Sequence, residues 1–195
     1  SHFSEIKNIL NVGSGGRRDL YNSLENKEIK VFEVDFQGDN DLQLNLDKIE
    51  KLPFSDNEYE CVCCFDVLEH LENFHKMTDE LIRVSSKKIF ISLPVSSAMF
   101  LNILRNKKKK NVQEGYYFKF YGLPIEVPND RHRWLLTVKD IEVFFENLVK
   151  KKNLNLNFFS HKKKSIKFKI LKFFLGERIT KELTLPFVWI MLEKK

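Results

Sequence analysis

Hydrophobic and polar residues follow two different periodicities along the first half of the chain. Short apolar runs bounded by polar or turn-forming residues predict buried strands, whereas apolar residues spaced three or four apart predict helices with one buried face. The strands are expected over residues 8–12, 29–34, 42–46, 59–65 and 88–93, and the helices over 17–24 and 69–84. Such alternation is typical of an α/β protein whose mainly parallel sheet carries helices on both faces.

The second half is less regular. Helix, helix, strand, helix and strand are expected, in that order, over residues 96–104, 138–149, 154–159, 166–175 and 185–192. The second of these helices has a capping signal, Thr137 followed three residues later by Asp140. We expect one domain over residues 3–195, with a lid-like insertion at about 105–136 and a basic helical insertion at about 162–182.

A glycine-rich turn follows the first predicted strand. The sequence LNVGSGG, from Leu10 to Gly16, leads an apolar run directly into glycines, which let a backbone approach a ligand closely. About twenty residues later the second predicted strand is followed by Asp35, where nucleotide-binding α/β folds hold a ribose through its hydroxyls. Together the turn and the acid predict a ligand that contains a nucleoside.

Two further blocks follow the glycine turn and its acid. One is Leu46-Asp47 followed by LPFSDNEY at residues 52–59, and the other is DVLEHL at residues 66–71. In this order and spacing, the four blocks resemble those of class I S-adenosylmethionine-dependent methyltransferases, in particular small-molecule enzymes with a D-V-L-E-H block. The RHRW segment at residues 131–134 also resembles a stretch found after the fifth strand in many of these enzymes.

The resemblance implies a Rossmann-like, seven-stranded, mostly parallel sheet with an antiparallel last strand, and S-adenosylmethionine as the cofactor. It implies that the turn at Gly13 and Gly15 approaches the methionine and ribose part of the cofactor. Asp35 would accept hydrogen bonds from the ribose hydroxyls. Asp47 or its neighbours would line the adenine pocket, and Asp66 would orient the methionine end or face the acceptor.

The chain departs from the family pattern at two positions. Asn11 stands where many members have Asp or Glu, and Arg17 stands where the third glycine often lies. Asn11 can still accept a hydrogen bond, whereas Arg17 would narrow the turn. These departures leave a second interpretation open, in which the chain is a non-catalytic module that binds the cofactor or a partner.

Methyl transfer to a hydroxyl also needs a base for the acceptor's proton. The candidates are His132, His70 and Asp66. Each has a structural alternative: Asp66 can cap the next helix together with Glu69, His70 can be a structural residue in that helix, and His132 can bind backbone in a loop packed by Trp134. No spacing of histidines and carboxylates in the sequence predicts a metal site.

The acceptor is the least specified part of the prediction. Because RHRW resembles segments of enzymes in surface-polysaccharide and lipid-linked glycan pathways, we expect O-methylation of a sugar or glycan acceptor. The net charge of +6 and the aromatic stretch from Tyr116 to Tyr121 favour an RNA or ribosome methyltransferase instead. Apolar residues interleaved with lysines from Ile166 to Leu175 predict either a core-facing helix or peripheral contact with a membrane. The oligomeric state is left open.

All three cysteines, Cys61, Cys63 and Cys64, lie in one predicted buried strand. Neighbouring strand residues point to opposite faces, so we expect core thiols rather than metal ligands. Free cysteines suit a reducing compartment, and no apolar run reaches the length of a membrane span. We therefore expect a cytoplasmic protein, at the inner face of the membrane if its acceptor is lipid-linked.

Overall fold

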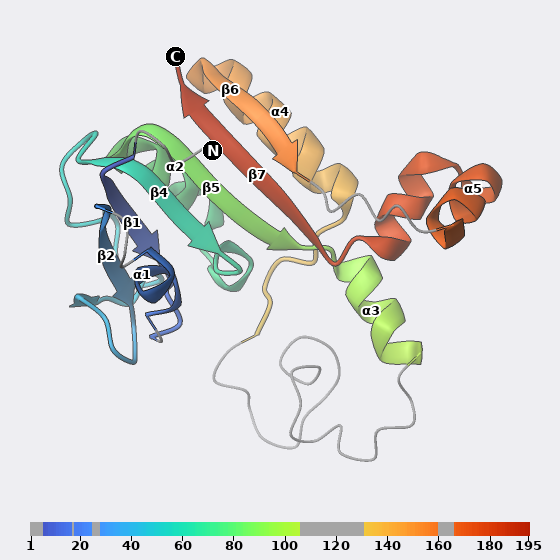
Figure 1. The fold of residues 1–195 in the computed structure, drawn as a ribbon, viewed down its shortest axis with the longest axis horizontal. Coiled ribbons are helices and arrows are strands. Elements are labelled where there is room, and N and C mark those ends of the chain that lie inside the picture. The colour runs from blue at the N-terminus through green and yellow to red at the C-terminus, as the bar shows by residue number, and fades with distance from the viewer. Residues whose placement is uncertain (1–5, 17, 25–27, 106–130, 160–165) are drawn as a thin grey trace.

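Seven strands form one sheet in the computed structural model, which describes residues 6–16, 18–24, 28–105, 131–159 and 166–195. The strands are β1 (Asn8–Val12), β2 (Lys30–Asp35), β3 (Leu42–Gln43), β4 (Tyr59–Phe65), β5 (Ser85–Pro94), β6 (Leu154–Phe159) and β7 (Phe187–Lys194). Their order across the sheet is β3-β2-β1-β4-β5-β7-β6 (Figure 1).

Strand direction confirms the predicted fold class. Strands β1 to β5 pair in parallel, and β7 lies antiparallel between β5 and β6. This is the mostly parallel, Rossmann-like sheet with an antiparallel last strand that the resemblance implies. The carboxyl ends of parallel strands share one edge, where open α/β sheets bind their ligands. The segments that follow β1, β2, β4 and β5 therefore meet at this carboxyl edge.

Helices cover the two faces of the sheet unequally. On one face, α2 (Phe74–Val84) and α4 (Val138–Lys152) bury Leu81, Ile141 and Phe145 in the main core. On the other face, α1 (Asp19–Leu24) covers a smaller cluster. Cys64 belongs to the main core, whereas Cys61 and Cys63 belong to the smaller cluster. The three thiols are free and buried, as expected.

The predicted helix over 69–84 is wrong in its first turn. The chain instead forms a short 3-10 helix, η1 (Leu68–His70), and α2 begins only at Phe74. The Glu69 carbonyl accepts hydrogen bonds from the backbone N–H groups of Arg133 and Trp134, and the Leu71 carbonyl accepts one from the Trp134 indole. Carbonyls that are engaged in this way do not accept the bonds of a continuous α-helix.

Other boundaries differ by a few residues. The strand expected over 42–46 is reduced to β3, and β5 begins at Ser85 because this residue already pairs with Tyr59. The predicted capping box at the start of α4 is present: the Thr137 side chain accepts from the Asp140 N–H, and the Asp140 carboxylate accepts from the Thr137 N–H.

Helices α3 (Ser96–Arg105) and α5 (Ile166–Thr184) lie beyond the carboxyl end of β5 and pack against each other (Figure 1). Helix α5 is longer than the predicted 166–175 and is broken at Gly176, whose φ is +75°. Among the described residues, no helix is both long and apolar enough to cross a membrane. Residues 106–130 of the predicted lid-like insertion and residues 162–165 of the predicted basic insertion lie outside the described residues.

Candidate functional site

The glycine turn after β1 depends on residues without side chains. Gly13, Gly15 and Gly16 all have positive φ angles, which L side chains rarely adopt. The Gly13 N–H donates to the Val34 carbonyl at 2.7 Å. A Cβ atom added at Gly13 would lie 2.1 Å from a methyl group of Val67. The turn therefore packs directly against the segment that follows β4.

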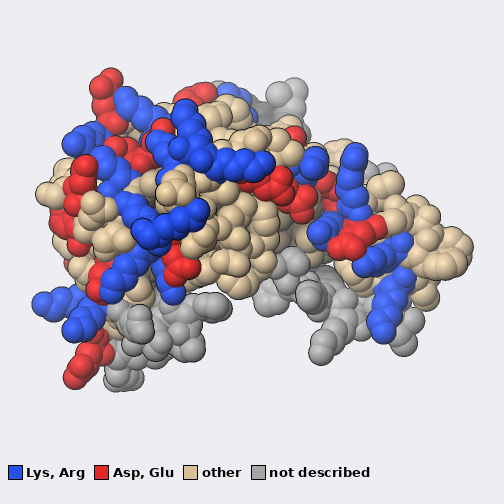
Figure 2. Space-filling view, turned by 90° about the horizontal axis from the view of Figure 1, so that it is seen from above, with Lys and Arg blue, Asp and Glu red and all other residues tan. Residues whose placement is uncertain are grey.

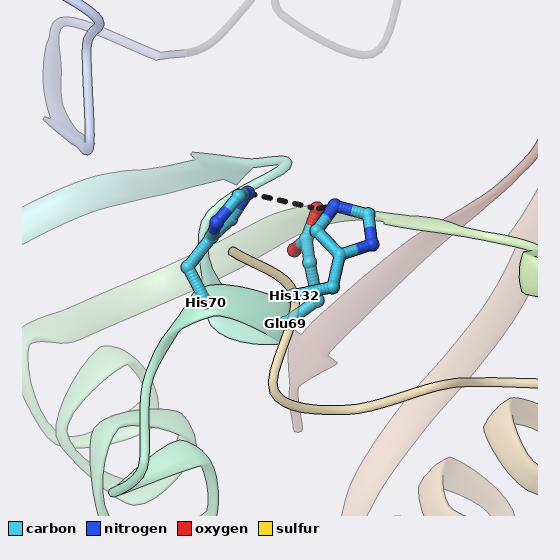
Figure 3. Close-up of side chains that lie close together, drawn as sticks. All are labelled: Glu69, His70 and His132. Atoms are coloured by element: carbon cyan, nitrogen blue, oxygen red, sulfur yellow. Dashed lines mark ion pairs between the residues drawn. The ribbon is translucent and has the colours of Figure 1, made fainter. Parts of the chain in front are cut away.

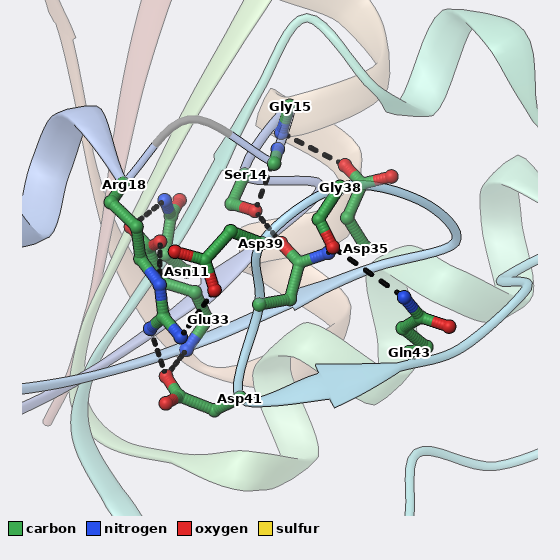
Figure 4. Close-up of polar contacts among 12 residues, drawn as sticks. Asn11, Ser14, Gly15, Arg18, Glu33, Asp35, Gly38, Asp39, Asp41 and Gln43 are labelled. Atoms are coloured by element: carbon green, nitrogen blue, oxygen red, sulfur yellow. Dashed lines mark hydrogen bonds and ion pairs between the residues drawn. The ribbon is translucent and has the colours of Figure 1, made fainter.

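The predicted acid and the predicted turn meet at the carboxyl edge (Figure 4). One oxygen of the buried Asp35 carboxylate, Oδ2, accepts a hydrogen bond from the Gly15 N–H at 2.9 Å. The other oxygen accepts from the Phe36 N–H at 2.7 Å. The structure thus brings Gly15 and Asp35 together across paired strands, and it places a negative charge beside the turn.

The loop after β2 closes onto the glycine turn, a contact that the motif analysis missed. A Cβ atom added at Gly16 would lie 2.6 Å from the Gly38 Cα, so the two backbones are in direct contact. The Asp39 N–H donates to the Gly16 carbonyl at 3.2 Å, and the Ser14 hydroxyl donates to the Asn40 side chain at 2.5 Å. The turn-forming sequence QGDN at residues 37–40 was the available signal.

Asn11, the first departure from the family pattern, pairs with an acid on the neighbouring strand. Its side-chain N–H donates to the Glu33 carboxylate at 3.1 Å, and both residues are buried. Arg18 lies 3.9 Å from the same carboxylate and donates to Asp41 at 2.8 Å. The hydrogen bond to Asp41 is the main cause of the raised pKa of Arg18. The second departure, Arg17, lies outside the described residues.

Asp66 follows β4 at the same edge, and it does not cap a helix, which was the structural alternative for this residue. The N-cap position of η1 is Val67, which makes no side-chain capping bond. The Asp66 carboxylate instead accepts a hydrogen bond from the Ser92 hydroxyl at 2.8 Å, which ties it to β5. Reduced contact with water raises the pKa of Asp66, while the Ser92 bond and the nearby His70 act in the opposite direction.

Glu69, His70 and His132 come together in a group that we call the histidine cluster (Figure 3). The Nε2 atoms of His70 and His132 lie 3.8 Å and 3.7 Å from the same oxygen, Glu69 Oε1. The two imidazole rings are 4.7 Å apart and nearly perpendicular. The sequence suggested each histidine separately, but it gave Glu69 only a capping role.

Backbone hydrogen bonds fix the segment that carries His132. The N–H groups of Arg133 and Trp134 donate to the Glu69 carbonyl at 2.8 and 3.2 Å, and the Trp134 indole donates to the Leu71 carbonyl at 2.7 Å. His132 is consequently held over η1, with its imidazole only 2% exposed, whereas the His70 imidazole is 18% exposed.

Asp47, predicted to lie near the adenine, instead contacts residues beside the histidine cluster. Its carboxylate accepts from the Glu72 N–H at 3.0 Å and pairs with the Arg133 guanidinium at 3.2 Å. A separate apolar cavity of about 150 Å³ lies between α2 and α4 and is lined in part by Trp134 and Phe144. Its lining contains none of the glycine-turn residues and none of the three histidine-cluster residues, so it is distinct from both groups.

Part of the chain matches a known protein family, and its fold is similar to that of several solved structures. Residues 10–90 match the family model of a methyltransferase domain. The structure is similar to an S-adenosylmethionine-dependent methyltransferase from Archaeoglobus fulgidus, with a TM-score of 0.62, 12% identity, and coverage of 98% of this chain and 88% of that one. None of the curated protein sequences matches the chain.

Two more solved structures show the same fold. The methyltransferase domain of the bacterial CtHen1 has a TM-score of 0.59 and 14% identity, with 97% of this chain and 91% of that one covered. The plantazolicin methyltransferase BpumL in complex with SAH has a TM-score of 0.60 and 11% identity, with 97% of this chain and 77% of that one covered.

Proposed function

We propose that this chain is a class I S-adenosylmethionine-dependent methyltransferase that methylates a hydroxyl group of a sugar or lipid-linked glycan. Support for the class comes from the match of residues 10–90 to the family model of a methyltransferase domain and from the shared fold. The observation that carries this proposal is the shared edge: the glycine turn with Asp35 lies on one side of the carboxyl edge, and the histidine cluster lies on the other. The first side suits the cofactor, and the second offers groups that can accept a proton from the acceptor hydroxyl.

The residues on the first side fit the cofactor. Gly13 and Gly15 provide a turn without side chains, and Asp35 offers a buried carboxylate beside it. We assign ribose recognition to Asp35, because a carboxylate binds a pair of hydroxyls strongly. Asp66 would contact the methionine end. Asp47, predicted from the sequence to line the adenine pocket, instead pairs with Arg133 beside the histidine cluster, so we assign it to the acceptor side.

Bound S-adenosylmethionine supplies a methyl group on a sulfonium, which is already activated for in-line substitution. The chain's task is therefore to position the acceptor oxygen and to take its proton as the new C–O bond forms. His70 is more exposed than His132, so His70 is better placed to meet an acceptor. Asp66, whose pKa is raised, is the second group that can receive the proton.

A sugar acceptor is supported by the chemistry around His132. Polar side chains from three segments, including Arg133 and the acids Asp47 and Glu72, surround this part of the edge. Polar and charged side chains of this kind suit an acceptor that carries several hydroxyls or a phosphate.

RNA is the second candidate acceptor, and two observations favour it. The chain carries a net charge of +6, and the similar structures include small RNA methyltransferase HEN1. On the face of the molecule seen in Figure 2, basic and acidic side chains are intermixed and do not form one continuous basic surface. A sugar acceptor therefore remains our first choice.

Helix α5 supports peripheral membrane contact as an addition to this function. Phe173 and Phe174 are 84% and 74% exposed, and Lys169 and Lys172 lie on the same helix. Exposed aromatic side chains beside lysines are typical of helices that lie on anionic membranes. Sedimentation with anionic vesicles should remove the protein from solution, and Phe173→Ser should reduce this binding. Equal recovery with and without vesicles would exclude the membrane contact.

Transfer of radiolabelled methyl groups tests the acceptor directly. The protein would be incubated with methyl-labelled S-adenosylmethionine and, in parallel, with nucleotide-sugars, glycan extracts and total RNA. We expect label in the sugar or glycan fraction, and little of it with the His70→Gln variant. Label that appears only in RNA would replace the sugar proposal with the second candidate.

A further inference from the structure

We propose that the histidine cluster, Glu69, His70 and His132, binds a divalent transition-metal cation. Each residue offers one ligand atom, and these atoms all lie within 4.8 Å of one another. The three side chains come from two segments that are far apart in the sequence, η1 and the segment before Trp134, and they converge at the carboxyl edge (Figure 3).

The distances within the cluster suit a shared cation. His70 Nε2 and His132 Nε2 lie 3.8 and 3.7 Å from Glu69 Oε1. A direct N–H···O hydrogen bond is shorter, about 2.7–3.2 Å. Ligand atoms that each lie about 2.0–2.2 Å from one cation are roughly 3–4 Å apart. Both histidine–carboxylate separations fall in that range, and both nitrogens face the same oxygen.

Burial and charge favour the same conclusion. The Glu69 side chain is 1% exposed and the His132 side chain 2% exposed. A divalent cation bound in such a site would interact strongly with the Glu69 carboxylate, because charges interact more strongly away from water. Both imidazoles would bind it in their neutral form.

The backbone holds the three donors in place before any cation binds. Glu69 and His70 are adjacent in η1, and the carbonyl of Glu69 itself anchors the N–H groups of Arg133 and Trp134 beside His132. A site fixed by its own supporting bonds binds metal with little rearrangement. This arrangement distinguishes the cluster from exposed acidic groups that are merely close together.

The ligand types indicate which cations fit. Two imidazoles with one carboxylate suit Zn²⁺, Co²⁺, Mn²⁺ or Fe²⁺, whereas Mg²⁺ and Ca²⁺ prefer oxygen ligands. Three protein ligands also leave coordination positions open. Because His70 is the most exposed of the three, the open side of the site lies toward the edge where the acceptor is proposed to bind.

The role of the cation rests on the proposed function, although its binding does not. A cation that holds the acceptor oxygen would lower the pKa of the hydroxyl. In that state the imidazoles serve as ligands, and Asp66, which lies beside His70, is left to receive the proton.

Cobalt binding tests the proposal without cofactor or acceptor. The full chain, free of any purification tag, would be titrated with Co²⁺ near neutral pH and followed by visible absorption and calorimetry. We expect one Co²⁺ per chain, displaced by Zn²⁺ but not by Mg²⁺. His70→Gln and His132→Gln should each weaken binding by at least about tenfold.

His75→Gln is the matched control, because His75 is an exposed histidine on α2 that lies outside the cluster. It should bind Co²⁺ like the wild type. If His132→Gln unfolds, the more exposed His70→Gln decides the result, with circular dichroism confirming its fold.

Two results would overturn the metal site: no Co²⁺ uptake by the wild type, or equal affinity in His70→Gln and His75→Gln. Because no acceptor is present, failure to methylate sugars would leave this measurement unaffected.

Discussion

The carboxyl edge has a cofactor side, which we propose holds the cofactor and which contains the glycine turn and Asp35, and a histidine side, which contains the histidine cluster. The hydrogen bond that ties the glycine turn to Asp35 joins residues close in the sequence, whereas the bond that ties Trp134 to Leu71 joins residues much farther apart. Gly15 and Asp35 are 20 residues apart, and they meet because β1 and β2 are adjacent strands. Trp134 and Leu71 are 63 residues apart, and they meet only after the chain has completed β5 and α3. The hydrogen bond between Gly15 and Asp35 thus forms within one β-α-β unit, whereas the bond between Trp134 and Leu71 is a long-range tertiary contact.

This difference teaches which parts of the site tolerate change. On the cofactor side, backbone lies against backbone or against the partly buried side chain of Val67, so even one added methyl group has no space. On the histidine side, side chains and carbonyls hold the segment, so the loss of one bond should loosen it without blocking the fold. The two sides should therefore respond separately to mutation.

The largest effect is expected for Gly13→Ala. The new Cβ would lie 2.1 Å from Val67 Cγ2, at a φ of +75°. Left-handed strain of about 1–2 kcal/mol together with overpacking of about 1–3 kcal/mol should lower the free energy of unfolding by roughly 2–5 kcal/mol. Urea denaturation measures this loss.

Gly176→Ala is the control for strain alone. Gly176 has the same φ of +75°, but among the described residues no atom outside its own stretch of helix lies within 4 Å of its added Cβ. The Gly176→Ala variant should lower the free energy of unfolding by only about 1–2 kcal/mol. If both variants lose the same stability, the close contact between Gly13 and Val67 does not limit which residues are tolerated at position 13.

A smaller effect is expected for Trp134→Phe. This change removes the indole bond to the Leu71 carbonyl and keeps a ring beside Phe74. The free energy of unfolding should fall by about 0.5–1.5 kcal/mol, the usual contribution of a hydrogen bond. Because only the histidine side is loosened, methyl transfer should drop while cofactor affinity stays within about twofold.

Trp189→Phe, at a tryptophan on β7 that contacts Phe65, is the matched comparison. It should leave methyl transfer unchanged. A parallel loss of cofactor affinity in Trp134→Phe would show that the two sides are not independent.

The smallest effect concerns the pH dependence of stability at Asp66. Folding raises the pKa of this carboxyl, so the folded state binds the proton more tightly than the unfolded state. Stability from this group is therefore greatest at low pH and falls as pH rises from about 4 through the folded pKa. Asp66→Asn should flatten that fall, measured by thermal unfolding across the acidic range. A steeper fall in the variant would mean that folding does not raise the pKa of Asp66.

The sequence indicated that the glycine turn and Asp35 meet, because the signals for this contact are local. A strand, a glycine turn and an acid at the end of the next strand specify one another through strand pairing, and the structure places Gly15 beside Asp35 as these motifs indicate. The start of α2 was mispredicted because the carbonyls of Glu69 and Leu71 bond to Arg133 and Trp134. No local pattern records those bonds, and for the same reason the cluster at Glu69 was missed.

The central claim is that Asp35 and the glycine turn hold the cofactor, and calorimetric titration with S-adenosylmethionine and S-adenosylhomocysteine tests it most directly. We predict micromolar binding to the wild type and a loss of roughly 1.5–3 kcal/mol in Asp35→Ala, the scale of hydrogen bonds to a charged group. Asp39→Ala, at a largely exposed acid in the same loop, should bind like the wild type. Unchanged affinity in Asp35→Ala, or no binding to the wild type at millimolar ligand, would contradict the account.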